Sequence, residues 1–258
     1  LMVESVLIPT ETRTTACVSS QVGCSLNCEF CATAKLKRMR NLEVAEIVDQ
    51  VALIDRQSKE YFERPLSNIV FMGMGEPMMN YKNVVEAIHK ITKPEGLGMS
   101  PRRITVSTSG IPKMIKMLAD ENLRVKLALS LHSAIEHKRN EIMPFSDKFP
   151  LTDIMESLQY WYKKTGSPIT FEYCVWDGIN DQDEDIKALI KFCRQVPSKV
   201  NLIEYNPIGE GKYDKRNIKA EEKYVRDLEK AGITIIVRRS RGGDIDAACG
   251  QLANKNAE

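Results

Sequence analysis

The stretch NIVFMGMGEPMMNYKNVVEAIHKIT, residues 68–92, contains the unit from which the predicted fold is built. Its mostly apolar beginning predicts a strand over 68–73, and apolar residues at helical spacing predict a helix over 82–92. The glycine-rich turn Gly73–Pro77 joins the two elements. A strand followed at once by a helix is the repeating unit of parallel sheets.

Similar units recur along the chain, so the sheet is predicted to be large. Short strands are expected at 5–8 and 15–19 and a helix over 42–56; further strands at 103–107, 125–131, 169–175, 200–205 and 233–237; further helices at 112–121, 136–142, 151–164, 183–194 and 219–231. About six units fit an α/β partial TIM barrel, (β/α)6, as well as a doubly wound sheet. In both folds ligands bind at the carboxyl ends of the strands.

The composition indicates one globular unit without a strong overall electrostatic field. The 258 residues are 43% hydrophobic and 28% charged, and the net charge is +2. RNA or other anions would therefore have to meet local basic patches. No interdomain linker is evident. We expect a single domain over 1–258, with a strand extension at 1–16, the partial barrel at 17–240 and a loop at 241–258.

The termini and the cysteines indicate a reducing compartment. No signal peptide and no apolar stretch of about 20 residues is evident, so a cytoplasmic protein without membrane contact is expected. Because the sequence begins at Leu1, we expect it to be a fragment of a longer gene product. Seven cysteines, three of them within eight residues, argue for a metal site rather than a disulfide scaffold.

Cys24, Cys28 and Cys31 form a Cys-x3-Cys-x2-Cys loop. Thiolates suit iron–sulfur clusters or zinc, and no histidine lies nearby in the sequence. Three ligands on a [4Fe-4S] cluster leave one iron open, and the amino and carboxylate groups of S-adenosylmethionine (SAM) can chelate it. Zinc, or a fourth ligand from Cys17 or a distant cysteine, is the alternative. The spacing, with an aromatic residue before the last cysteine, favours radical SAM chemistry.

Polar or small residues recur at the predicted carboxyl ends of the strands and are the candidates to bind SAM. Glu76 can accept from the SAM ammonium, and glycine lets backbone approach a ligand. Each residue alone would more often be a cap, a turn residue or, for the histidine, a structural side chain. The candidates are Gly75, Glu76, Ser107, Ser130, Leu131, His132 and Asn206.

Two cysteines outside the loop are candidates for chemistry. Cys249 lies in a late segment with a glycine on each side, which suggests a mobile loop that places a thiol. The segment Cys24–Cys31 is called the metal loop below, and Cys17 precedes its first cysteine by seven residues. A buried apolar thiol is the plain alternative. Cys174 and Cys193 fall within an apolar strand and an amphipathic helix, so core packing is expected for both.

Several of these motifs together resemble the RlmN-type RNA methyltransferases. The matching segments are 17–24, the cysteine triad, 73–77, 107–110, 130–132, 206–207 and 244–252, and they run over nearly the whole chain. The resemblance implies a [4Fe-4S] cluster and two SAM molecules per turnover. One SAM methylates the residue that matches Cys249. The other yields a 5′-deoxyadenosyl radical that takes hydrogen from this methyl group, and the methylene radical adds to adenine.

The resemblance also implies roles for other residues and for partners. The thiol matching Cys17 resolves the protein–RNA adduct, and Glu4 matches the acceptor of the adenine C2 proton. The implied substrates are adenine 2503 of 23S rRNA and adenine 37 of tRNA. A disulfide bond is implied as well. Reduction of the cluster requires an electron donor such as flavodoxin or ferredoxin, and a monomer is expected.

Three basic segments, 35–40, 102–103 and 238–241, are candidate phosphate contacts, and Tyr160–Tyr162 could stack on bases although helical packing is favoured. Two features depart from the family: Lys37-Arg38 after the metal loop, and an absent N-terminal accessory domain. The alternatives are an adenine-C8 methyltransferase, a radical SAM activase, which would not need the two extra thiols, and a zinc- or cluster-bearing RNA-binding module without catalysis.

Overall fold

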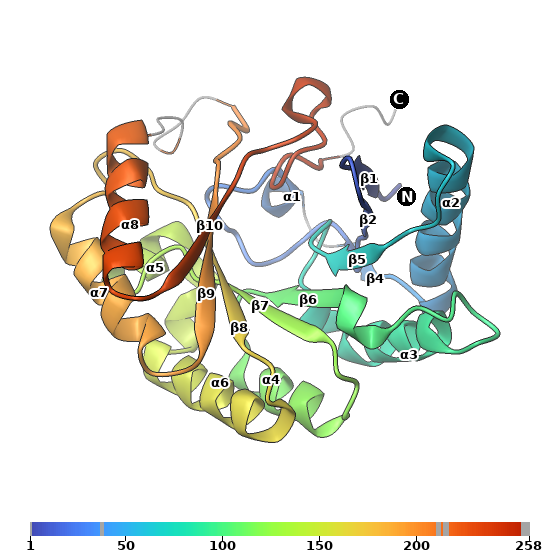
Figure 1. Ribbon diagram of the computed structural model, residues 1–258, viewed down its shortest axis with the longest axis horizontal. Helices are drawn as coiled ribbons and strands as arrows, with labels where there is room; N and C mark the ends of the chain where they lie inside the picture. The colour runs from blue at the N-terminus through green and yellow to red at the C-terminus, as the bar shows by residue number, and fades with distance from the viewer. Residues whose placement is uncertain (1, 37–38, 210–212, 214–216, 254–258) are drawn as a thin grey trace.

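A curved sheet of eight strands organises the molecule (Figure 1). The computed structural model describes residues 2–36, 39–209, 213 and 217–253. In sheet order the strands are β1 (Val6–Pro9), β2 (Thr14–Cys17), β5 (Asn68–Phe71), β6 (Ile104–Thr108), β7 (Lys126–Ser130), β8 (Ile169–Tyr173), β9 (Ser198–Ile203) and β10 (Thr234–Arg238). β1 runs antiparallel to β2, and all other neighbours are parallel. The predicted α/β partial barrel is confirmed.

Helices accompany the sheet and pack on its outer side, except for the short α1 (Ala32–Lys35), which lies within the curve of the sheet (Figure 1). The others are α2 (Val44–Phe62), α3 (Tyr81–Thr92), α4 (Pro112–Asp120), α5 (Glu136–Ile142), α6 (Leu151–Thr165), α7 (Asp183–Cys193) and α8 (Ile218–Lys230). Short 3₁₀ turns occupy Pro77–Asn80, Pro101–Arg103, Pro144–Lys148 and Gly243–Ile245. A two-stranded ribbon joins β3 (Gln21–Val22) and β4 (Arg40–Asn41).

Alternation along β8 separates the core from the inside of the barrel. Phe171 stacks on Phe192 of α7, and Tyr173 lies against Tyr224 of α8. Successive strand side chains point to opposite faces, so Glu172 points away from these helices and toward the concave side. Glu172 accepts a hydrogen bond there from Asn201 of β9 at 2.9 Å. One sheet face therefore makes the apolar core, and the other carries polar groups.

The core contains three side chains for which the sequence favoured packing. Cys174 and Cys193 are both 5% exposed and pack in apolar clusters, as expected. Trp161 is 1% exposed, and its indole N–H donates to the Ser167 carbonyl at 3.1 Å. The packing interpretation of the 160–162 segment is thus confirmed for its central residue, which is not available to stack on a base.

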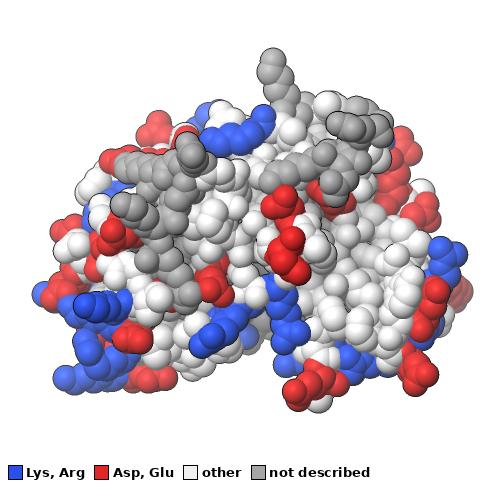
Figure 2. Space-filling view, turned by 90° about the horizontal axis from the view of Figure 1, so that it is seen from above, with Lys and Arg blue, Asp and Glu red and all other residues white. Residues whose placement is uncertain are grey.

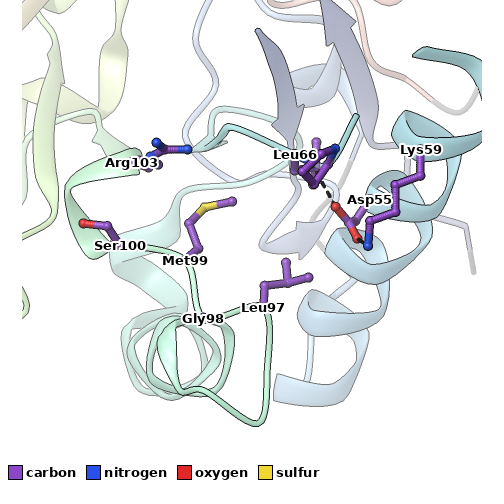
Figure 3. Close-up of a pocket in the computed structure, with 9 residues that line it drawn as sticks. Asp55, Lys59, Leu66, Leu97, Gly98, Met99, Ser100 and Arg103 are labelled. Carbon is purple, nitrogen blue, oxygen red and sulfur yellow. Dashed lines mark hydrogen bonds and ion pairs between the residues drawn. The ribbon is translucent and has the colours of Figure 1, made fainter. Parts of the chain in front are cut away.

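A hollow of about 400 Å³ lies at the amino ends of β5 and β6, at the opposite end of these strands from their carboxyl termini (Figure 3). Asp55 in its wall accepts from the Leu66 N–H at 2.9 Å and pairs with Lys59 at 2.6 Å. Its buried charge is therefore already satisfied by the protein. Arg103 also lines this hollow, so the 102–103 pair lies away from the polar strand ends.

Among the described helices, none is both long and apolar enough to cross a bilayer.

Candidate active site

The predicted site residues gather where the parallel strands end. Glu76 follows β5, Ser130 closes β7, His132 follows it, and Asn206 lies three residues past β9. Parallel strands bring their carboxyl ends to one rim, so residues far apart in sequence meet there. Ser109 and Glu76 make this contact directly, because the Ser109 N–H and hydroxyl both donate to Glu76 Oε2, at 2.8 and 2.9 Å.

The metal loop lies against this rim. Cys24 is 9% exposed, and Cys28 and Cys31 are half-buried. The thiols lie close enough to act on one another: burial, and then the neighbouring Cys31 and Cys24, raise the pKa of Cys28 well above its usual value. Burial raises the pKa of Cys24 to about 11. Three soft donors in one partly covered loop fit an iron–sulfur cluster.

Hydrogen bonds to two other parts of the chain hold the loop and the adjoining α1. The Glu29 N–H donates to the Ile142 carbonyl at the end of α5, at 3.1 Å. The Ala32 N–H donates to the Gly250 carbonyl at 2.7 Å, and the Thr33 hydroxyl donates to the Leu252 carbonyl at 2.6 Å. The last two bonds join α1 to the C-terminal segment, which lies beside α1 in Figure 1. Cys249 is thereby brought to the metal loop.

Within the part of the chain that the structure describes, no three His, Cys, Asp or Glu side chains close around a single-ion position. The fit to a cluster accordingly rests on the donor chemistry and on the surroundings of the loop. Among these surroundings is Arg139, which is 0% exposed and has two unpartnered N–H groups.

Glu76 is a buried carboxylate and not the solvated turn residue that its position in the sequence allows. It is 4% exposed, and burial raises its pKa although several hydrogen bonds act in the opposite direction. Its Oε1 accepts from the Met78 N–H at 3.0 Å. Glu76 therefore caps the 3₁₀ turn and ties β5 to β6. Contact with the SAM ammonium stays a prediction.

Close contacts within the protein explain the two glycines of the 73–77 turn. A Cβ on Gly73 would lie 2.5 Å from Ser19 Oγ, and a Cβ on Gly75 would lie 2.4 Å from Gln21 Cβ. Gly75 also has a φ of +90°, which favours glycine. The segment that approaches these glycines is the 18–21 stretch after β2. The sequence argument expected a ligand at this point, so a role of Gly75 toward SAM stays a prediction.

His132 is enclosed in aromatic and polar groups. It is 3% exposed with a φ of +53°, and its ring centre lies 4.4 Å from that of Phe30. Nδ1 accepts from the Cys174 N–H at 3.2 Å. Burial, and then the charge of Arg139, lower the pKa of His132 to about 3. The imidazole is thus neutral and connects β7, β8 and the metal loop.

This environment predicts a loss of stability in acid. The unfolded imidazole takes up its proton near pH 6.5 and the folded one near pH 3, so the unfolded state binds more protons in between. The free energy of unfolding should fall by roughly 1–2 kcal/mol from this residue between pH 7 and pH 5. His132→Asn does not titrate there and tolerates positive φ. Denaturant unfolding at both pH values should show a flatter pH dependence for this variant; an unchanged slope would contradict the assignment.

Cys17 and Cys249 lie near each other, with Arg238 beside both. Burial, and then Cys249, raise the pKa of Cys17 to about 12, while Arg238 acts to lower it. Cys249 is exposed to solvent, yet the surrounding protein raises its pKa to about 11, against the opposing effect of Arg238. Arg238 Nη1 also lies 3.7 Å from Glu172 Oε2. Two thiols, one cation and one carboxylate thus share the concave side of the sheet.

Asn206 connects the strand ends to the Cys249 segment. Its amide donates to the Cys249 carbonyl at 3.3 Å and to the Glu204 carbonyl at 3.4 Å. The contact spans 43 residues of sequence. The observed role of Asn206 is to position the segment that carries Cys249, and a contact with SAM stays a prediction. Ser107, Ser130 and Leu131 lie at the same rim, with Leu131 wholly buried.

Glu4 is held at the same end of the sheet by its backbone. Its N–H donates to Met74 Sδ at 3.4 Å, and the Ser19 hydroxyl donates to its carbonyl at 2.5 Å. Both partners belong to the segments that follow β2 and β5. The residue is half-buried, so the plain interpretation of an exposed strand residue does not describe it.

The implied disulfide is not present. All seven cysteines lie in the described part of the chain, and each is a free thiol.

Several described basic residues of the three candidate segments are already engaged within the protein. Arg40 is engaged with Glu46, at 2.6 Å, and Lys37-Arg38 lie outside the described residues. Arg241 donates to the Pro9 carbonyl at 2.6 Å, and Arg238 faces Glu172. On the face shown in Figure 2, acidic and basic side chains are interspersed around a broad uncharged area.

Sequence reasoning missed Arg139 and Glu172. For Glu172 a signal existed, because a single carboxylate stands between apolar residues in the alternating β8 sequence, on the face opposite the core. For Arg139 no signal existed, since α5 is highly charged and reads as a solvated helix. Its complete burial arises between elements, where Nη2 donates to the carbonyls of Ser109 and Ser130.

Comparisons with known proteins agree with this geometry. Residues 18–193 match the Radical SAM superfamily. The probable dual-specificity RNA methyltransferase RlmN of Christiangramia forsetii is 67% identical over 257 residues, covering 100% of this chain and 73% of that protein. The protein of the same name from Flavobacterium psychrophilum is 68% identical over 255 residues, covering 99% of this chain and 74% of that protein.

A solved structure extends the similarity to three dimensions. The radical SAM methyltransferase from Sphaerobacter thermophilus superposes with a TM-score of 0.94 at 40% identity, covering 97% of this chain and 73% of that one. The level of identity, the coverage of both chains and the shared fold all point to the same family. This chain belongs to the RlmN family of dual-specificity RNA methyltransferases within the radical SAM superfamily.

Proposed function

We propose that this enzyme methylates C2 of adenine 2503 in 23S rRNA and of adenine 37 in tRNA, with Cys249 as the residue that carries the methyl group. The observation that supports the proposal most strongly is the meeting of Cys17, Cys249 and the metal loop at one end of the sheet. A radical SAM activase would need neither extra thiol. An RNA-binding module without catalysis would need neither the two extra thiols nor a metal loop that leaves one iron without a protein ligand.

The residues present fit the cofactors that the superfamily implies. Cys24, Cys28 and Cys31 would hold a [4Fe-4S] cluster, and the strand-end residues, with Glu76 and Ser130 among them, would surround SAM. When bound, the cluster supplies the electron that splits SAM and so provides a carbon radical. An electron donor such as flavodoxin or ferredoxin, and action as a monomer, complete the proposal.

The chain's own residues carry the methyl group to the base. The adenine C2 carbon is electron-poor, so direct nucleophilic attack on SAM would fail, whereas a carbon radical on the Cys249 side chain can add to it. Cys249 suits this task because it is solvent-exposed and its segment is tied to α1 and to Asn206. Cys17 lies beside Cys249, so its thiolate can attack the Cys249 sulfur. An S–S bond then forms, the S–CH2 bond to the base breaks, and the departing carbon takes up a proton to become the methyl group.

Glu4 is proposed to take the proton from C2 after the addition. Its backbone is tied to Ser19 and Met74, close to the strand that carries Cys17. A carboxylate is a competent proton acceptor at neutral pH if it reaches the proton within hydrogen-bond distance. This assignment is what favours C2 over C8 of the ring.

The position of the methyl group tests the proposal directly. The anaerobically reconstituted protein is incubated with SAM, a reductant and either 23S rRNA or tRNA, and the RNA is digested to nucleosides. Mass spectrometry against synthetic standards should find 2-methyladenosine from both RNAs. Glu4→Gln should reduce its yield about 100-fold or more, because general base catalysis typically contributes this much. Finding 8-methyladenosine instead would reject the C2 assignment.

A further inference from the structure

Arg139 of α5 is a cation enclosed by protein with only part of its hydrogen-bonding capacity used. The side chain is 0% exposed. Nη2 donates to the Ser109 carbonyl at 2.5 Å and to the Ser130 carbonyl at 3.4 Å. Nε and Nη1 are buried and have no partner. Within the described residues, no carboxylate forms an ion pair with this guanidinium.

Such an arrangement is costly unless an anion lies nearby. An unpaired buried charge costs several kcal/mol, and buried cations in proteins are normally paired with an anion or with full hydrogen bonding. The same burial lowers the pKa of Arg139 to about 10. The fold therefore retains a cation at a place where the polypeptide alone does not compensate it.

The neighbour of this cation is the metal loop. Residues three apart share one face of a helix, so Arg139 and Ile142 line the same side of α5, and Met143 directly follows the helix. Ile142 and Met143 belong to the apolar cluster against which Cys28 and Phe30 pack. The Glu29 N–H donates to the Ile142 carbonyl, so the backbone beside Cys28 is hydrogen-bonded to this end of the helix.

Electrostatic interactions also favour a pairing of Arg139 with the metal loop. Two anionic groups act on Arg139 electrostatically, Glu136 more strongly and Cys28 less strongly. Glu136 already accepts from the Leu151 N–H, at 3.0 Å. Three thiolates around a four-iron core carry net negative charge, which grows when the core takes up an electron. A fixed cation beside them stabilises the more negative form.

We propose that Arg139 is a positioning residue that faces the cluster at Cys28 and raises its reduction potential. Its Nε and Nη1 groups have no partner in the protein and would be available to the cluster, while Nη2 donates to the carbonyls of Ser109 and Ser130 at the ends of β6 and β7. The inference rests on the cluster of the proposed function, but it does not depend on which RNA position is methylated.

The test is the midpoint potential of the reconstituted cluster, followed by electron paramagnetic resonance, without RNA and both without and with SAM. Arg139→Gln keeps a donor for the Ser109 carbonyl but removes the charge. At a fixed potential near the midpoint, its ratio of reduced to oxidised cluster should fall about tenfold, a shift of about 59 mV to more negative values. Arg139→Lys should stay near the wild-type potential.

Lys138→Met is the matched control. Lys138 is the neighbouring cation on α5, but it pairs with Glu184 and Asp185, each at 2.8 Å, on another side of the helix. Its removal should leave the potential unchanged. An R139Q protein with full iron content and the wild-type potential overturns the proposal, as does an equal shift in K138M. A shift that occurs only with SAM present overturns it as well, because the anion would then be the SAM carboxylate.

Cluster loss is informative too. If R139Q binds no iron while R139K binds it fully, the charge is required and the proposal stands. If both variants lose iron, the guanidinium serves packing alone and the proposal is rejected. Failure to methylate RNA by a wild-type protein with an intact cluster would count against the proposed function only, since the potential is measured without RNA.

Discussion

Replacing Cys249 by alanine is expected to lower RNA methylation at least about 1000-fold while reductive cleavage of SAM continues. The residue is the proposed carrier of the methyl group, so its loss removes an obligatory covalent step. SAM cleavage depends on the metal loop, whose three cysteines are untouched. Both activities are measured in one anaerobic reaction, methylated nucleoside by mass spectrometry and 5′-deoxyadenosine by chromatography.

Cys193→Ala is the control for this experiment. Cys193 is also a free thiol, but it is 5% exposed within the core face of α7 and remote from the proposed chemistry. This variant should methylate RNA at nearly the wild-type rate after allowance for any loss of folded protein. Full methylation by the Cys249→Ala variant would reject the methyl-carrier role. Loss of SAM cleavage in that variant would show that Cys249 supports the metal loop instead.

Replacing Cys17 by alanine is expected to leave RNA covalently joined to the protein. If Cys249 forms the bond to adenine and Cys17 attacks it, the variant completes the first step but not the second. Product release should fall by at least about 1000-fold. Denaturing electrophoresis of labelled RNA should show a slow band that protease digestion removes, and mass spectrometry should place the attachment at Cys249.

The double variant, with both Cys17 and Cys249 replaced by alanine, separates this outcome from nonspecific crosslinking. It should form no joined species, because the carrier is absent. Free, fully methylated RNA from the Cys17→Ala variant would contradict the resolving role. A joined species that persists in the double variant would mean that another residue forms the bond, and it would contradict the assignment of Cys249.

Most secondary structure could be predicted from local pattern. Strands β5 to β10 and helices α3 to α8 lie within about two residues of their predicted bounds, because apolar periodicity extends over each element. Helix α2 instead continues to Phe62, beyond the predicted end near residue 56. Its last turns are largely exposed and lack an apolar stripe, so the pattern ended before the helix did. The two-residue strands β3 and β4 are too short for any periodicity.

The candidate site likewise combines features that local sequence predicts with features that only the structure shows. The spacing of Cys24, Cys28 and Cys31 is a local property, and the position of Glu76 after a strand follows from the βα unit. The buried state of Glu76 was not predictable, because Ser109, 33 residues later, supplies two of its hydrogen bonds. The sequence argument expected the glycines of that turn to make room for a ligand, whereas in the structure Ser19 and Gln21 pack against them.

The sequence by itself determined the fold class, the metal loop and the family, because each depends on spacing over a few residues and on motifs that need no knowledge of distant contacts. Only the tertiary structure decided which groups meet. Hydrogen bonds spanning up to 219 residues bring Cys249 to α1, and Arg139 of α5 is buried against the ends of β6 and β7. The physical reason is that burial and charge pairing arise between elements, so a residue's environment is defined only when the sheet has curved and its strand ends have come together.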